Sequence, residues 1–196
     1  MTEREWTFLQ RWLAILATAI VLRVLAGIVS NYGAYLPTPD FGADFLLGRE
    51  QSFFRGWYQA AFLGHILAGP PAILLALVLV NPALRERSPR WHRRLGRFEA
   101  ALVGLILAPS GLVMATEPLP WLPPTERVVA GLGFATLALA TEATVALGFI
   151  AACRRRFTEH ERWMKRCMAL LLSAPLLRIM GGAATLVATD LPWTYA

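Results

Sequence analysis

Five apolar runs, each about 20 residues long, constrain what this chain can fold into more than any other feature of its sequence. They cover residues 12–30, 57–80, 98–115, 128–153 and 167–188. A helix rises about 1.5 Å per residue, so about 20 residues are needed to cross the ~30 Å of hydrocarbon in a bilayer. The pattern therefore predicts an all-α integral membrane protein, a bundle of five transmembrane helices.

The tryptophans support this prediction, because all seven lie at or just outside the ends of the apolar runs. They are Trp6, Trp12, Trp57, Trp91, Trp121, Trp163 and Trp193. The indole ring is apolar while its N–H requires a polar partner, so tryptophan favours the boundary between hydrocarbon and water. With 56% hydrophobic residues, the chain is also more apolar than a typical soluble domain. We expect an N-terminal helix and long loop (1–56), a four-helix core of two hairpins (57–188) and a short tail (189–196).

Basic residues gather on one side of the predicted bundle. The N-terminal segment and the loops 81–97 and 154–166 hold two, six and six of the nineteen Lys and Arg residues, whereas the segments on the other side hold three. Lys and Arg favour the cytoplasmic side of a membrane protein. We therefore expect a cytoplasmic N-terminus and an extracytoplasmic C-terminus. The same clustering explains the net charge of +6 without a nucleic-acid partner.

The longest connection, residues 31–55, lies on the predicted outer side. At 25 residues it is long for a turn between helices. It either forms a short amphipathic helix near residues 41–48 or is an ordered loop without one. On the opposite side, Cys153 and Cys167 flank the second basic loop, where a reducing environment favours free thiols over a disulfide or a metal pair.

The two basic loops share a motif. Residues 92–97 read His-Arg-Arg-Leu-Gly-Arg, and residues 160–166 read His-Glu-Arg-Trp-Met-Lys-Arg. Each places a histidine two residues before an arginine, and each runs directly into an apolar span. The spans on either side thus form two hairpins of similar plan, as in membrane proteins with internal duplication.

These motifs, with His65 in the second span and Leu177-Arg178 in the fifth, resemble the bacterial predicted membrane protein family called domain of unknown function 2306. The resemblance covers about residues 57–186, and its most specific element is His-x-x-Trp-Met-x-Arg. Glu161 departs from the pattern, which has a basic residue after the histidine. The resemblance implies a multi-pass protein of the bacterial inner membrane and brings no established activity with it.

Ionisable residues inside the predicted spans are the main candidates for function. Counted at about 1.5 Å per residue, Arg23 and Arg178 lie roughly 16 Å from the basic side. Glu142 lies at a similar depth, and His65 lies about 12 Å from the opposite side. Intramembrane charge costs about 2.5–3.5 kcal/mol on insertion scales, so such residues usually have a partner or a function. We expect Arg178 to pair with Glu142, with His65 as a titratable neighbour.

Two interpretations of these four residues stay open. They either pair with one another and hold the bundle in register, or their excess positive charge binds a carboxylate, a phosphate, a quinone oxygen or a haem propionate. Haem could be held between His65 and Met180, or at the basic boundary between His92 and His160. Otherwise the boundary histidines only form hydrogen bonds and contact lipid headgroups.

Sequence patterns of soluble enzymes do not occur in the chain. It has no phosphate-binding glycine loop, no G-x-S-x-G and no H-E-x-x-H. Two function classes therefore stay open. The first is a membrane protein that binds a redox cofactor or a small anionic or quinone-like ligand. The second is a non-catalytic protein, either a small carrier or an assembly partner of a membrane complex.

Overall fold

The computed structural model describes residues 3–43, 45–117, 120 and 122–186, and within these ranges it is helical without any strand. Four of its helices are long and apolar enough to cross a membrane: Phe8–Ala34, Tyr58–Leu79, Pro89–Ala115 and Pro124–Cys153. They coincide with the first four predicted spans, which confirms the all-α membrane fold. The predicted tail, 189–196, lies outside the described residues.

The helices follow one another with short connections, apart from the long loop after the first helix. Their bounds are α1 Glu3–Ser30, η1 Asn31–Ala34, α2 Glu50–Phe53, α3 Tyr58–Leu79, α4 Pro82–Arg87, α5 Pro89–Leu102, η2 Val103–Leu107, α6 Ala108–Ala115, α7 Pro124–Cys153, α8 Phe157–Leu171 and α9 Ser173–Leu186. The segment η2 is π-helical and joins α5 to α6 as one interrupted rod.

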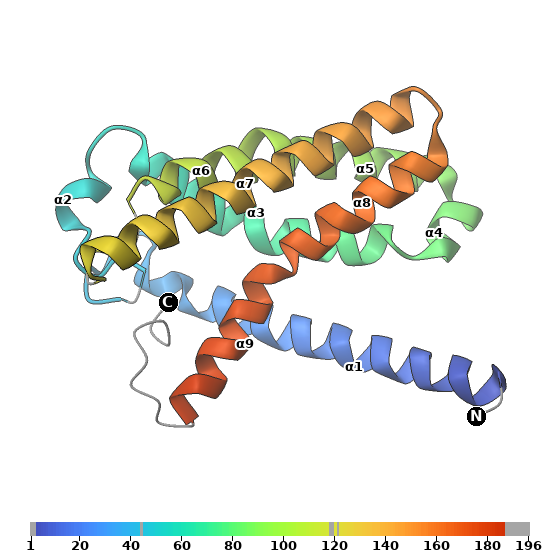
Figure 1. Ribbon diagram of the computed structural model, residues 1–196, viewed down its shortest axis with the longest axis horizontal. Coiled ribbons are helices and arrows are strands. Elements are labelled where there is room, and N and C mark those ends of the chain that lie inside the picture. Colours follow the sequence, from blue (N-terminus) through green and yellow to red (C-terminus); the bar gives the residue numbers. More distant parts are fainter. Residues whose placement is uncertain (1–2, 44, 118–119, 121, 187–196) are drawn as a thin grey trace.

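The centre of the bundle is formed by α3, the α5–η2–α6 rod, α7 and α8 (Figure 1). Side chains from all four meet in one apolar core, which includes Ala72, Val103, Val145 and Leu171. The first helix, α1, contributes the buried Leu25 to that cluster. Figure 1 shows α1 running below the bundle.

A proline in α3 creates the attachment point for the end of the first helix. Pro70 has no N–H, so it leaves the carbonyl of Ile66 without the usual intrahelical donor. The hydroxyl of Tyr32, in η1, donates a hydrogen bond to that carbonyl. A backbone group that would otherwise be unsatisfied in an apolar environment thus ties η1 to α3.

The fifth predicted span, 167–188, is not one continuous helix. Its described part belongs to α8 and α9, which are separated by a turn at Leu172. The buried Pro175 lacks the N–H that would bond to the carbonyl of Leu171, and α8 ends at that residue. Figure 1 shows α9 turning away from α7 and crossing α1.

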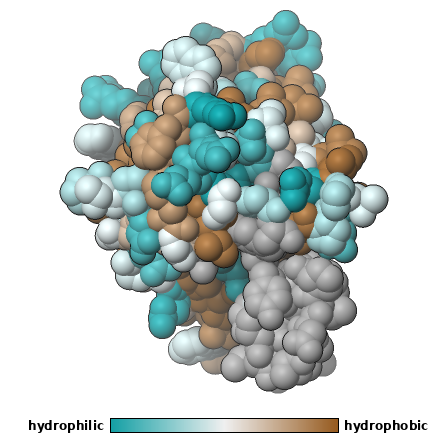
Figure 2. All heavy atoms as spheres, turned by 90° about the vertical axis from the view of Figure 1, so that its left-hand side faces the viewer, coloured by the Kyte–Doolittle hydropathy of each residue, from teal (hydrophilic) through white to brown (hydrophobic). Residues whose placement is uncertain are grey.

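Of the two alternatives for the long outer loop, the described residues agree with an ordered loop that has no helix near residues 41–48. Residues 41–43 and 45–48 form turns and a bend, and the helical segments of the loop among the described residues are η1 and the four-residue α2. Aromatic side chains from the loop pack onto the end of α3: Phe53 lies 5.8 Å from Phe62, and Tyr35 lies 5.4 Å from Phe62, between ring centroids. Figure 2 looks onto this end of the bundle and shows hydrophilic residues over its middle, with hydrophobic residues beside them. Burial of aromatic rings, rather than helix formation, orders the loop.

Candidate functional site

The most unusual residue of the bundle is Glu99, which lies in the last turn of α5. Its side chain is only 1% exposed, and neither carboxyl oxygen has a hydrogen-bond partner. Buried polar groups are nearly always hydrogen-bonded, and an intramembrane ionisable residue without a partner is costly. The sequence reading missed Glu99, because it placed this residue at the edge of a span next to the basic loop.

The helix widens immediately after Glu99. In the π-helical segment η2, the N–H of Ala108 bonds to the carbonyl of Val103, five residues back. Pro109 follows and cannot donate to Leu105, so a regular α-helix cannot continue through this point. Single-turn π segments within α-helices are frequent at functional sites.

A second carboxyl group approaches this segment from α7. The oxygens of Glu142 lie 3.6 and 3.7 Å from the position that a Cβ atom on Gly104 would occupy. Oε2 of Glu142 is buried and has no hydrogen-bond partner. The carboxyl group of Glu142 therefore lies close to the backbone of η2 at Gly104.

Cys167 of α8 forms the third side of the cluster. Its thiol is within electrostatic range of both Glu99 and Glu142, and it interacts with the hydroxyl of Thr144. Cys167 is buried, and the Thr144 hydroxyl also donates to the carbonyl of Ala140, 2.9 Å away. Two carboxyl groups, a thiol and a hydroxyl thus gather between α5, α7 and α8. We call these four residues, Glu99, Glu142, Thr144 and Cys167, the carboxyl cluster.

His65 lies further along the bundle, toward the outer loop. Its Nδ1 is 3.2 Å from the carbonyl of Leu107 and 3.1 Å from the hydroxyl of Ser110. Because a carbonyl only accepts, this geometry assigns the proton to Nδ1 and leaves the lone pair on Nε2. A Cβ atom on Gly111 would lie 3.3 Å from Cε1 of His65, so the ring packs against α6 and faces the bundle interior.

The two arginines of the predicted midplane group have different surroundings. The guanidinium of Arg178 lies 4.1 Å from the ring centroid of Phe45 in the outer loop. Arg23 is exposed on α1, and its Nη1 lies against Gly27 of the same helix. The described contacts therefore associate Arg178 with the outer loop, and the ion pair between Arg178 and Glu142 stays a prediction.

The boundary histidines, in contrast, come together. His92 of α5 is within electrostatic range of His160 on α8 and of Arg85 on α4. Nδ1 of His160 lies 2.9 Å from the carbonyl of Gly148, which again places the ring proton on Nδ1. Nδ1 of His92 is buried without a hydrogen-bond partner. The two sequence motifs thus meet at one end of the bundle.

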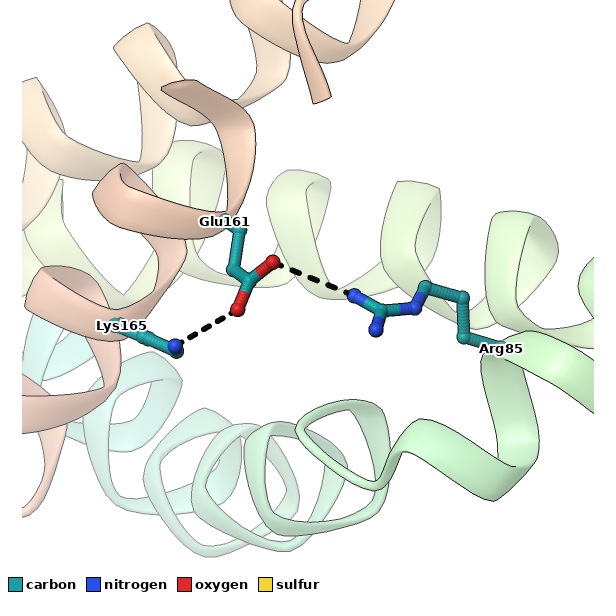
Figure 3. Close-up of polar contacts among 3 residues, drawn as sticks. All are labelled: Arg85, Glu161 and Lys165. Carbon is teal, nitrogen blue, oxygen red and sulfur yellow. Dashed lines mark ion pairs between the residues drawn. The ribbon is translucent and has the colours of Figure 1, made fainter. Parts of the chain in front are cut away.

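Glu161, the residue that departs from the family pattern, connects the two hairpins. Its carboxylate lies 2.7 Å from Nζ of Lys165 and 3.6 Å from Nη1 of Arg85 (Figure 3). The Lys165 ammonium, one helical turn away, lowers the pKa of Glu161. An acidic residue at this position therefore joins α8 to α4 through an exposed ion-pair network.

At the other end of the bundle, the buried Arg49 holds the outer loop in place. Its Nη1 donates to the hydroxyl of Tyr58, 2.6 Å away, and to the backbone carbonyl of Glu117. Burial lowers the pKa of the Arg49 guanidinium, but arginine stays charged at any physiological pH. From the sequence, Arg49 is only one of three basic residues on the outer side, because no pattern in the neighbouring residues indicates that its side chain is buried.

A comparison with known proteins supports the membrane assignment. The model of a family described as "Predicted membrane protein (DUF2306)" matches residues 62–195, which is more than half of the chain. No curated protein and no solved structure matches the chain.

Proposed function

The chain belongs to the DUF2306 family of predicted membrane proteins, and on that premise we propose that it is a small carrier whose core takes up and releases protons at Glu99 and Glu142. The burial of the Glu99 carboxyl group, with neither oxygen hydrogen-bonded, is the observation that carries the proposal. An ionised carboxylate in such a place would be strongly disfavoured, so Glu99 is the neutral acid.

The composition of the carboxyl cluster suits protons better than a metal ion. Among the described residues, no group of three or more His, Cys, Asp and Glu side chains is arranged to hold a metal. Carboxyl, thiol and hydroxyl groups that lie together can accept and donate protons without leaving the helices. The π-helical segment beside them supplies a part of the rod that can change its hydrogen bonding at low cost.

Infrared spectroscopy of the purified protein tests the protonation state directly. We expect the carbonyl stretch of a protonated carboxylic acid in apolar surroundings at neutral pH. Glu99→Gln should remove that band, while Glu86→Gln, on the exposed surface of α4, should leave it unchanged. If the wild-type spectrum contains no band that Glu99→Gln removes, Glu99 is ionised and the proposal is wrong.

The carrier role is tested in sealed vesicles that contain a trapped pH indicator. Small organic anions, cations and neutral solutes are added outside, one class at a time. A proton-coupled carrier changes the internal pH only with its own solute class, and Glu99→Gln should abolish that change. A pH change that is the same for every solute, or that persists in Glu99→Gln, contradicts coupling through Glu99.

A redox cofactor is the second candidate, and the geometry of His65 favours it. With Nδ1 bonded to the Leu107 carbonyl, Nε2 is available as a ligand, which is the usual arrangement of a metal-binding histidine. This function predicts a Soret band in the visible spectrum of protein purified from haem-replete cells, and loss of the band in His65→Ala. A colourless protein with a proton-sensitive Glu99 supports the carrier instead.

We further propose that the protein spans the bacterial inner membrane five times, with the N-terminus in the cytoplasm. The excess of Lys and Arg in the segments before residue 12 and at 81–97 and 154–166 supports this orientation. The pair α8–α9 then makes the fifth crossing as a broken helix. Single cysteines at Ser88 and Thr38, in a Cys153→Ser, Cys167→Ser background, should react with an impermeant reagent from opposite sides of sealed vesicles. Equal labelling contradicts the topology.

A further inference from the structure

A cavity lined by arginines opens at the basic end of the bundle, outside the carboxyl cluster. It has a volume of about 470 Å³ and lies at the junction of α4 and α5, where it is lined by Arg87, Arg90, Arg94, Trp91, Ser88 and Pro89. Arg94 lies 5.5 Å from the ring centroid of Trp91. No acidic side chain among the described residues forms an ion pair with these three arginines, and the nearby Glu86 does not line the cavity.

A second, apolar groove meets this cavity. It has a volume of about 610 Å³ and runs between α1 and α3, and its lining includes Leu22, Leu74 and Val78. These three side chains are 44%, 42% and 47% exposed, so the groove is open to its surroundings. The groove ends at Arg87 and Ser88, which line both cavities.

We propose that the two cavities together bind one anionic phospholipid, with its phosphate among Arg87, Arg90 and Arg94 and an acyl chain in the groove between α1 and α3. Guanidinium groups match phosphate oxygens in charge and geometry. The N-terminus of α5, a 14-residue helix that begins at Pro89, adds the positive end of a helix dipole. The N–H groups of Trp91 and His92 bond to the Ser88 carbonyl, so the arginine side chains supply the hydrogen-bond donors of the site. Trp91 stands near the start of the candidate span Pro89–Ala115, an end position that suits tryptophan at the boundary between headgroups and hydrocarbon.

The shape of the combined site decides between a lipid and a free anion. A soluble phosphate would need only the arginine cavity and would leave the apolar groove unused. A neutral lipid would fill the groove but would leave three arginines without a counter-charge. An anionic phospholipid satisfies both parts, because its headgroup and its acyl chain belong to one molecule and the two cavities share Arg87 and Ser88.

The proposal is tested with the full-length protein in detergent, titrated with phosphatidylglycerol or phosphatidylcholine and analysed by native mass spectrometry. We expect selective retention of phosphatidylglycerol. Arg87→Ala with Arg90→Ala should weaken it at least about tenfold, because charge-assisted hydrogen bonds are lost. Arg154→Ala with Arg155→Ala removes the same charge from the same end of the bundle but lies outside the cavity, and it should change retention by about twofold at most. Equal losses in the two double variants would show diffuse attraction only and would overturn the site.

Two further arms separate the headgroup from the acyl chain. Val78→Trp should fill part of the groove and weaken phosphatidylglycerol binding while every arginine remains. This variant tests the site independently if the arginine double variant does not fold. Glycerol phosphate, the free headgroup, should compete poorly at equal concentration. If Val78→Trp has no effect, or if glycerol phosphate competes as well as the lipid does, the groove has no part in binding and the proposal is wrong. Equal retention of phosphatidylcholine would also overturn it.

Discussion

The carboxyl group of Glu142, on α7, lies against the bare backbone of Gly104, with its oxygens 3.6 and 3.7 Å from where a Cβ atom would be. This contact joins α7 to the π-helical segment of the third span. A Cβ atom at residue 104 would be in ordinary van der Waals contact with the carboxyl oxygens, so the site has space for a methyl group there. The same contact places Glu142 beside Cys167 and Glu99 within the carboxyl cluster.

Substitutions at Gly104 should depend on size. Gly104→Ala places a methyl group at ordinary contact distance from the Glu142 oxygens, and alanine favours helix, so its stability should stay within about 1 kcal/mol of wild type. Gly104→Leu must displace the carboxyl group and should cost about 1–3 kcal/mol through overpacking. Thermal melting in detergent measures both. Gly133→Leu is the matched control, because its added side chain meets open space. If Gly133→Leu lowers the stability as much as Gly104→Leu does, the contact between Gly104 and Glu142 is not the cause of the loss.

A close contact between α7 and α8 predicts a compensating pair. A Cβ atom on Gly148 would lie 2.6 Å from Sδ of Met164, so the methionine must move in Gly148→Ala. We expect that variant to cost about 1–3 kcal/mol, and we expect addition of Met164→Ala to cost less than the sum of the two single changes. A double-mutant cycle by thermal melting measures the coupling. Strict additivity would mean that the two side chains do not compete for space.

Arg49 should stabilise the outer loop. Arg49→Ala removes the donor for the Tyr58 hydroxyl and the Glu117 carbonyl and leaves both groups short of a partner. Hydrogen bonds to a charged group contribute about 1.5–3 kcal/mol, so the variant should lose at least that much stability. Proteolysis between residues 31 and 57 should become faster. Arg55→Ala, which removes an exposed arginine of the same loop, should leave proteolysis unchanged.

The ion-pair network of Glu161 should be sensitive to acid. Lys165, and then Arg85, lower the pKa of this carboxyl group, so its contribution to stability is complete above the unfolded-state pKa and is lost as the pH falls through the lowered pKa. Because the pair is exposed, the contribution is small and decreases with salt. The difference in melting temperature between wild type and Glu161→Gln should therefore be largest at neutral pH and low salt, and it should vanish in acid. A difference that is independent of pH, or one equal to that of Glu86→Gln, would argue against the network.

The meeting of the two histidine motifs predicts a crosslink. With Cys153 and Cys167 replaced by serine, His92→Cys and His160→Cys in one chain should be joined by a short bifunctional reagent, because the two side chains interact across the α5–α8 boundary. Crosslinking is detected by the mobility shift of the closed chain. Arg94→Cys with His160→Cys is the control, since Arg94 lies on Trp91 at the arginine cavity. Equal yields for both pairs would show that the labelling reflects a flexible end rather than a defined contact.

The sequence by itself determined that this is a helical membrane protein, and it located the first four spans and the basic end of the bundle. These features depend on the length of apolar runs and on charge asymmetry, which are local properties of the chain. The repeated motif places both His92 and His160 at the basic boundary, because two helices that begin at the same boundary bring their first residues to the same depth. That the two histidines are within electrostatic range of each other follows from the tertiary structure. The continuous fifth span was not found, since Pro175 ends α8 even though the hydropathy stays high across the turn.

Only the tertiary structure decided which polar groups share the interior. Glu99 reads as part of a basic, interfacial segment, yet helix rotation turns it into the core, beside a π-helical segment that forms where Pro109 prevents regular hydrogen bonding. The sequence predicts similar depths in the membrane for Arg178 and Glu142. In the structure, however, the guanidinium of Arg178 packs on the ring of Phe45, whereas the carboxyl group of Glu142 packs against Gly104. Depth along a helix follows from residue number, whereas the direction in which a side chain points depends on how each helix is rotated and bent against its neighbours.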